Sequence, residues 1–164
     1  MDRGNLYGAP SETLQILLDD PAEHDFACAR RVLEGLSGDL AVLRPHGLPC
    51  SVAEIVAHLL SNAYFNLGVI DSPDPASYRS PLPDWPEVSA SDWDRLREEY
   101  LAVLERLHTV SEETTLERVV FPANADEAGW TVGYKLTCSV AKHAAYHMGQ
   151  IVLLRRLLGA WKES

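Results

Sequence analysis

The chain has 164 residues, of which 46% are hydrophobic and 23% are charged. This length and composition suit one globular domain over residues 1–164 and exclude a disordered or fibrous chain. The formal net charge of −10 argues against a nucleic-acid partner, whose phosphates bind basic surfaces. Three cysteines without a CxxC pair favour a cytoplasmic location over a disulfide framework. No apolar run approaches the roughly 20 residues of a membrane span, so no membrane partner is expected.

The first third of the chain predicts two helices. A short helical segment is expected over 11–19. A first long helix is then expected from Pro21 to about Leu43, because proline suits the first turn of a helix and apolar residues follow at helical spacing. That apolar stripe consists of Phe26, Ala29, Leu33, Leu36, Leu40 and Leu43.

Two more long helices are expected on either side of a loop. Ser51, followed three residues later by Glu54, forms the signature of a capping box and begins a helix that runs to about Ile70. Residues 71–88 are rich in Pro, Ser and Asp and are expected to form a long loop. Ser89 or Ser91 then begins the third helix, which carries apolar residues at helical spacing.

The last third of the chain predicts an irregular connection and a fourth helix. Residues 116–121 are β-prone and favour a short strand or an extended lid. Thr131 begins the fourth helix, which runs to about Leu158 and ends at Gly159. These elements predict an all-α four-helix bundle. The long loop between helices two and three can return along the bundle, so an up-down-down-up order is allowed.

The fourth helix carries two histidines in its inward-facing stripe. His143 and His147 are four residues apart, which places their Cβ atoms about 5–6 Å from each other. His58 borders the apolar face of the second helix. Two buried neutral imidazoles would need hydrogen-bond partners and two charged ones would repel, whereas a divalent metal satisfies both. Three histidines with a fourth position left to water or a thiol describe an open catalytic site.

The same residues also have a structural interpretation. A histidine near an apolar face is usually a satisfied core residue, and HxxxH without the glutamate of HExxH does not imply a metalloprotease. Glu54 and Asn62 lie one turn on either side of His58 and are within reach of it, although Glu54 is equally a helix cap. Gln150 lies next to the histidine turn and could hydrogen-bond a ligand, or could serve packing alone. Spacing alone leaves these alternatives open.

Two segments resemble a known family. The run from His143 to Gly159 (HAAYHMGQIVLLRRLLG) combines HxxxH, Gly-Gln, a late Arg and a terminal Gly. It resembles the last helix of the DinB/YfiT-like family of four-helix bundles. The run from Arg44 to Leu59, which contains His58, is similar to the second helix of that family and its entry loop. The resemblance extends from about residue 22 to residue 159.

The resemblance implies an up-down-down-up bundle that is often a homodimer. It also implies a divalent metal, zinc or nickel, on His58, His143 and His147, with Glu54, Asn62 and Gln150 as candidates for supporting those ligands. Family members include enzymes that use low-molecular-weight thiols and others described as metal-dependent hydrolases.

The expected function is therefore a metal-dependent enzyme. Its metal would activate a low-molecular-weight thiol or water for thiol S-transfer to, or hydrolysis of, a small-molecule substrate; no protein side chain is assigned as catalytic. The alternative is a noncatalytic, stress-related dimeric bundle with a structural or vestigial metal site. Tyr64, Phe65 and Trp161, taken as exposed apolar residues, make a homodimer plausible.

Overall fold

A computed structural model of the chain describes residues 10–23, 26–113 and 115–162. Most of the described chain is helical, with one small antiparallel hairpin. The helices and strands are α1 (Pro10–Leu18), α2 (Ala29–Leu33), α3 (Gly38–Ala41), η1 (Pro45–Gly47), α4 (Val52–Asp71), η2 (Ala90–Asp92), α5 (Trp93–Glu113), β1 (Val119–Phe121), β2 (Trp130–Thr131), α6 (Val132–Tyr134), the π-helical segment η3 (Lys135–Ala141) and α7 (Lys142–Leu157).

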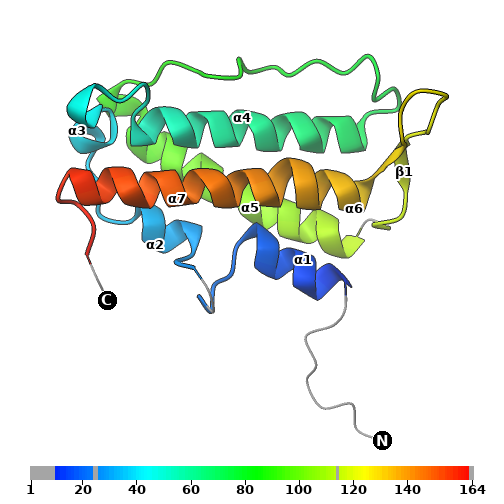
Figure 1. The fold of residues 1–164 in the computed structure, drawn as a ribbon, viewed down its shortest axis with the longest axis horizontal. Coiled ribbons are helices and arrows are strands. Elements are labelled where there is room, and N and C mark those ends of the chain that lie inside the picture. Colours follow the sequence, from blue (N-terminus) through cyan, green and yellow to red (C-terminus); the bar gives the residue numbers. More distant parts are fainter. Residues whose placement is uncertain (1–9, 24–25, 114, 163–164) are drawn as a thin grey trace, which may run out of the picture.

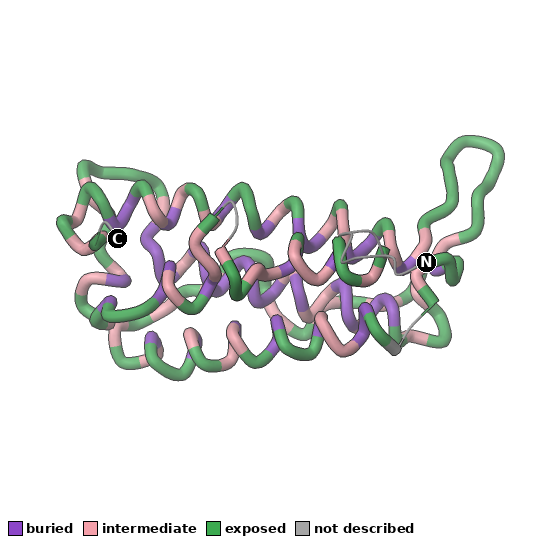
Figure 2. The backbone as a smooth tube through the Cα atoms, turned by 90° about the horizontal axis from the view of Figure 1, so that it is seen from below, coloured by how far each residue is buried: buried purple, intermediate pink, exposed green. Residues whose placement is uncertain are grey.

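Three long helical units form the body of the molecule. Figure 1 shows α4 and α5 running in the same direction, while α6, η3 and α7 form one continuous helix running the opposite way. The short helices α1 and α2 follow one another along one edge, where they pack on α5 and on the last helix. The buried hydrophobic side chains form one cluster between these units. Figure 2 shows this burial along the middle of the molecule, with the hairpin standing exposed at one end.

The predicted continuous helix from Pro21 to Leu43 is wrong. Residues 19–23 and 26–28 leave the helical path, and two carboxylates from the first of these stretches cap the chain instead. Asp19 Oδ1 accepts a hydrogen bond from the backbone N–H of Ala29 at 2.8 Å, and Glu23 Oε1 accepts one from Cys28 at 2.9 Å. These bonds satisfy the free N–H groups that begin α2. Phe26, expected in the buried stripe, is 76% exposed.

A second break separates α2 from α3. Gly35 has φ +68°, a left-handed conformation that favours glycine. Ser37 then caps α3, because its side chain accepts a hydrogen bond from Leu40. At Gly38 the backbone of η2 approaches so closely that a Cβ atom would lie 2.1 Å from the carbonyl oxygen of Ala90. The apolar residues of this region have helical spacing, but Gly35 and the cap at Ser37 divide the region into two short helices.

The beginning of α4 is as predicted. Ser51 and Glu54 form the capping box, and Glu54 also pairs with Arg44. Residues 72–89 form the expected long loop, which returns along α4 (Figure 1). The ring of Tyr78 in this loop lies where a Cβ atom at Gly68 would be. A glycine at this position of α4 therefore lets the loop lie directly on the helix.

The end of the chain contains the predicted strand and the last helix. β1 lies within the β-prone residues 116–121 and pairs with β2. Thr131 caps α6 by accepting a hydrogen bond from Tyr134. Near the other end, the buried guanidinium of Arg155 donates to backbone carbonyls of Val32, Glu34 and Ala160, which fastens α7 to α2.

The three apolar residues expected on an exposed face are half-buried instead. Tyr64 donates its hydroxyl hydrogen to Glu99 at 2.9 Å. The Phe65 ring packs on the ring of Tyr78, with centroids 5.9 Å apart. Trp161 lies against two arginine side chains near the end of α7. These three side chains are therefore less exposed than expected, and the homodimer itself stays a prediction.

Candidate metal centre

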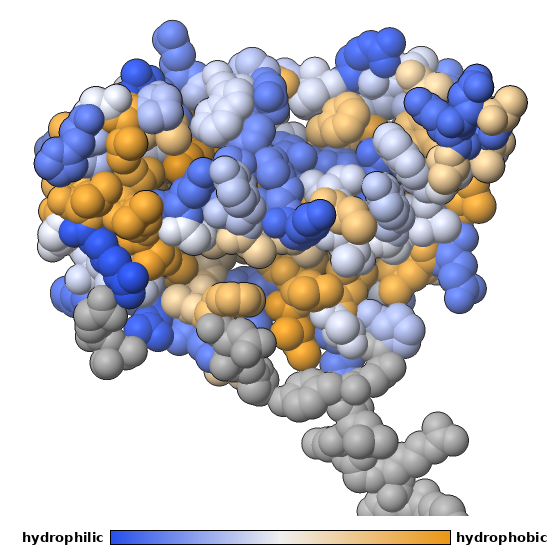
Figure 3. Space-filling model, viewed as in Figure 1, coloured by the Kyte–Doolittle hydropathy of each residue, from blue (hydrophilic) through white to orange (hydrophobic). Residues whose placement is uncertain are grey.

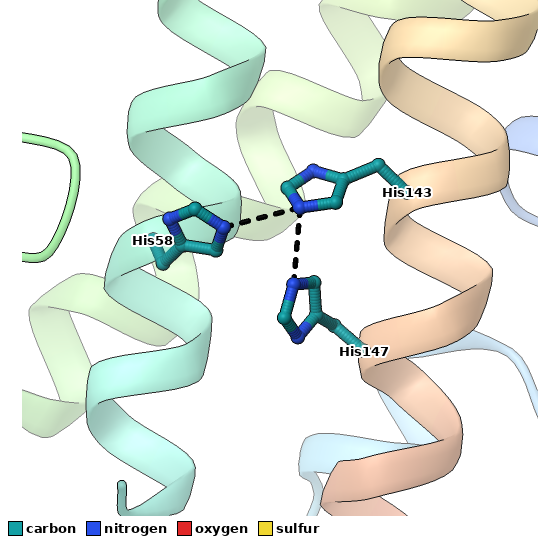
Figure 4. Close-up of side chains that lie close together, drawn as sticks. All are labelled: His58, His143 and His147. Atoms are coloured by element: carbon teal, nitrogen blue, oxygen red, sulfur yellow. Dashed lines mark hydrogen bonds between the residues drawn. The ribbon is translucent and has the colours of Figure 1, made fainter.

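The three predicted histidines come together between α4 and the last helix. His58 projects from the second turn of α4, and His143 and His147 project from the beginning of α7. Their rings point toward one another (Figure 4). The Nε2 atom of His143 lies 3.1 Å from Nε2 of His58 and 3.0 Å from Nε2 of His147. One nitrogen of each ring therefore faces a common point.

The outer nitrogen of His58 is held by the long loop. Nδ1 donates a hydrogen bond to the backbone carbonyl of Asp84 at 2.8 Å, and Oδ1 of the same residue lies 3.2 Å away. The indole of Trp85 stacks on the imidazole, with centroids 4.0 Å apart and planes 2° from parallel. A protonated Nδ1 leaves the lone pair on Nε2, the nitrogen that faces the cluster.

The outer nitrogen of His147 is held within α7. Nδ1 donates to the side-chain carbonyl oxygen of Gln150 at 2.7 Å. The lone pair of His147 therefore also lies on Nε2, toward the cluster. Of the three side chains expected to support the histidines, Gln150 makes such a contact.

The other two supporting side chains do not reach His58. Glu54 is engaged with Ser51 and Arg44 at the beginning of α4. For Asn62, the structure shows its backbone carbonyl accepting from Asn66, and no side-chain hydrogen bond to His58 in the part of the chain described. The interpretation of Glu54 as a cap is the one the structure supports.

Sequence reasoning missed Asp84 and Trp85. Both lie in a loop without helical periodicity, between Pro83 and Pro86. The available signal was the length of the loop, which allows it to return along α4. Which of its residues would meet His58 depends on the path of the loop, and no local pattern encodes that path.

His143 is the least satisfied of the three. Its Nδ1 atom is buried and has no hydrogen-bond partner among the described residues. The pKa of His143 is lowered to about 4, mainly by burial and further by charge repulsion from the neighbouring His147 and His58. Burial also lowers the pKa of His147, against an opposing effect of the hydrogen bond to Gln150. The environment therefore disfavours protonation of both rings.

The three imidazoles have too few N–H groups facing the cluster to hydrogen-bond one another. Since Nε2 of both His58 and His147 carries a lone pair, only His143 can donate inside the cluster. One N–H cannot make two good hydrogen bonds, and giving that proton to Nε2 leaves Nδ1 an unpaired acceptor. A cation accepts all three lone pairs at once, and three neutral imidazoles suit a divalent transition metal. The residues present therefore fit a metal ion.

The cluster has no fourth protein ligand within the described ranges. His58, His143 and His147 form the group of potential ligands, with ligand atoms within 4.8 Å of one another. Two aromatic side chains stand beside it: Trp85 is 47% exposed and Tyr146 is 65% exposed, and both rings contact His147 edge-on. The site is thus buried at His58 and His147, half-buried at His143 and bordered by aromatic surface.

Fold and site together define a helical protein with a three-histidine cluster of the kind that holds a metal. A sequence model of the DinB superfamily matches residues 26–151. The chain belongs to the DinB superfamily. Searches of the curated proteins and of the solved structures each found no match. None of the described helices combines the length and apolar composition that a membrane crossing requires.

Proposed function

We propose that this protein is a metal-dependent enzyme that acts on a small electrophilic molecule. His58, His143 and His147 would hold one divalent ion, zinc or nickel. The reaction class is thiol S-transfer with a low-molecular-weight thiol, or hydrolysis with water. Membership of the DinB superfamily supports the proposal.

We also propose that the fold is an up-down-down-up four-helix bundle. In this bundle α1 and α2 together form the first helix, and the whole chain is one domain.

The observation that carries the proposal is the convergence of three Nε2 atoms, two of them fixed as lone-pair donors. Asp84 and Gln150 hold the outer nitrogens, which sets the tautomer and the ring orientation before any ion arrives. When bound, the metal would supply Lewis acidity that lowers the pKa of a thiol or water at its open position. The chain itself supplies three neutral ligands, a low-dielectric surround and an aromatic border.

The aromatic border defines where a substrate would lie. Trp85 covers one face of His58 and still exposes half of its surface, and Tyr146 contacts His147 from α7. Both can pack on an apolar substrate and exclude water from the reacting atoms. Their place beside the histidines favours an organic electrophile over a highly charged substrate.

The competing function is a noncatalytic bundle with a structural or vestigial metal. Structural zinc sites in proteins have four protein ligands, whereas catalytic sites keep a position open. The group of three histidines without a fourth ligand in the described part of the chain favours the catalytic class.

The proposed function is tested with the metal-reconstituted protein. We expect it to conjugate small thiols such as cysteine or glutathione to monochlorobimane, or to hydrolyse a p-nitrophenyl ester, at a rate that His143→Ala abolishes. Asn62→Ala is the control, because the Asn62 side chain makes no hydrogen bond to the cluster. Stoichiometric metal without either activity would favour the noncatalytic alternative. An activity that survives His143→Ala would show that the reaction does not require the histidine cluster.

We also propose that the protein is a cytoplasmic homodimer without nucleic-acid or membrane partners. Apolar surface at the end of the molecule where α7 finishes (Figure 3) supports self-association. Leu153 on α7 is 57% exposed, and Leu157 and Leu43 are also exposed. Sedimentation equilibrium tests the dimer; a monomer at all micromolar concentrations would contradict it.

A further inference from the structure

A second potential binding site lies on another face of α7. A cavity of about 540 Å³ lies where the predicted first helix is interrupted, and Leu18, Val32, Tyr100 and Met148 contribute to its walls. These residues come from α1, α2, α5 and α7, and none of the three clustered histidines lines the cavity. Ligand pockets in proteins have volumes of roughly 300–1,000 Å³. The cavity is therefore large enough for a small organic molecule.

The face of α7 that borders this cavity is hollowed by small side chains. Gly149 lines it, and a Cβ atom built at Gly149 would meet no atom within 4 Å. The glycine is therefore not required by close packing, although it lowers helix stability by about 1 kcal/mol relative to alanine. Gly149 instead leaves space open beside the helix.

Two carboxylates stand in the wall of the cavity directly after α1. Asp19 and Asp20 both line it. Oδ1 of Asp19 accepts the hydrogen bond from Ala29 that caps α2. Burial raises the pKa of Tyr100, and the charge of the nearby Asp19 carboxylate raises it further. Burial also raises the pKa of Asp19 itself. A half-buried carboxylate whose charge is disfavoured by its surroundings is stabilised by a cation beside it.

Tyr100 supplies a second polar group at the wall of the cavity. The residue is 2% exposed and lines the cavity, and the Asp19 charge acts on the pKa of its phenol, so the two groups lie near each other. Buried tyrosine hydroxyls usually take part in hydrogen bonds. A ligand group that reaches the Asp19 carboxylate can therefore also reach this hydroxyl.

We propose that this cavity binds a small, largely apolar molecule that carries a protonated amine. The amine would donate to the Asp19 carboxylate and to the Tyr100 oxygen, and the apolar part would fill the space beside Gly149. Arg156 also lines the cavity, so the opposite preference, for an anion, is an explicit outcome of the test. The proposal does not depend on the function assigned to the histidine cluster.

Three probes with one apolar skeleton test the proposal: 4-phenylbutylamine, 4-phenylbutanol and 4-phenylbutanoate. Isothermal titration calorimetry on the full chain measures their affinities. We expect the amine to bind at least about tenfold more tightly than the alcohol, as a charge-assisted hydrogen bond provides. The carboxylate should bind most weakly. Failure of the amine to bind at millimolar concentration, or tighter binding of the carboxylate, overturns the proposal.

Matched variants locate the binding. Asp19→Asn keeps an oxygen acceptor for Ala29 but removes the charge, so it should reduce the affinity for the amine about tenfold and leave the alcohol unchanged. Gly149→Met should fill the cavity and reduce binding of both probes, whereas Ala102→Met, at an exposed position of α5, should not. Trp85→Ala, beside the histidines, should also leave binding unchanged. Equal binding by wild type, Asp19→Asn and Gly149→Met overturns the proposal.

Discussion

Two buried polar sites lie between α4 and the last helix. One is a cluster of neutral bases, and the other is a single cation. The histidine cluster brings three neutral bases together with one proton too few to join them. Eight residues before His143, the Lys135 side chain is 5% exposed and has no carboxylate partner in an ion pair within the described chain. Its Nζ lies 4.6 Å from the centre of the Trp130 ring and within 6 Å of the rings of Phe65 and Phe121.

The contrast shows why only one of these places calls for a metal. Aromatic faces carry negative electrostatic potential and stabilise an ammonium by about 0.5–2 kcal/mol per ring. Lys135 therefore has its own partial compensation, although burial still lowers its pKa. The imidazoles have lone pairs facing one another and no cation of their own. Changes at the histidines should therefore alter metal binding strongly, and changes at Lys135 should not.

The largest expected effect is loss of a ligand. His143→Ala should weaken zinc or nickel binding by more than about 100-fold, which exceeds the 10–100-fold cost typical of losing a group that only supports a ligand. Competition against a chromophoric chelator measures the affinity. Lys135→Met is the matched control on the same helix and should retain wild-type affinity. Equal losses in both variants would mean that the effect reports on folding.

A smaller effect is expected where a ligand loses its support. Gln150→Leu removes the acceptor for Nδ1 of His147 and frees the ring to change tautomer, so metal affinity should fall about 10–100-fold. Asn62→Ala, one turn from His58, should have no effect. If Asn62→Ala weakened binding as much as Gln150→Leu, the assignment of support from the hydrogen bonds would be wrong.

Acid should destabilise the metal-free protein through the same histidines. The pKa of His143 is about 4 in the folded chain, below its ordinary value near 6.5. As pH falls from about 6.5 to 4, the unfolded chain takes up protons that folded His143 refuses, so folding stability decreases over that window. Urea unfolding as a function of pH measures this. His143→Ala should flatten the dependence; an unchanged slope would contradict the depressed pKa.

The smallest expected effect is at Lys135. Lys135→Met keeps the long apolar stem and removes a charge that the rings compensate only in part. The free energy of unfolding should change by less than about 1 kcal/mol, or increase. Chemical denaturation measures it. A loss of more than about 2 kcal/mol would show that the cation–aromatic contacts outweigh the cost of burying the charge.

The sequence was sufficient for the side chains on helices and insufficient for those on the long loop. HxxxH spacing and the apolar stripe of α4 placed the three histidines on inward helix faces, because helical periodicity fixes which side chains share a face. The family resemblance then favoured the interpretation in which they meet at a metal. The capping box at Ser51 and the cap at Thr131 were local signals and were sufficient. The partners of His58 were not predictable, because Asp84 and Trp85 reach it through a loop with no periodicity.

The first third of the chain shows where periodicity misleads. Residues 21–43 have helical spacing, yet Asp19 and Glu23 cap a new helix and Gly35 adopts a positive φ. Local capping and turn preferences therefore outweighed a helical stripe that already contained two glycines. The interruption produces the cavity beside α7, which the sequence pattern gave no reason to expect.

The most direct test of the central claim is a crystal structure of the zinc- or nickel-loaded protein with anomalous diffraction at the metal edge. The account predicts one ion about 2.0–2.1 Å from Nε2 of His58, His143 and His147, with no fourth side chain bound. Asp84 and Gln150 should still accept from the outer nitrogens. An ion bound through Nδ1, by fewer than three histidines or by an additional side chain would contradict it.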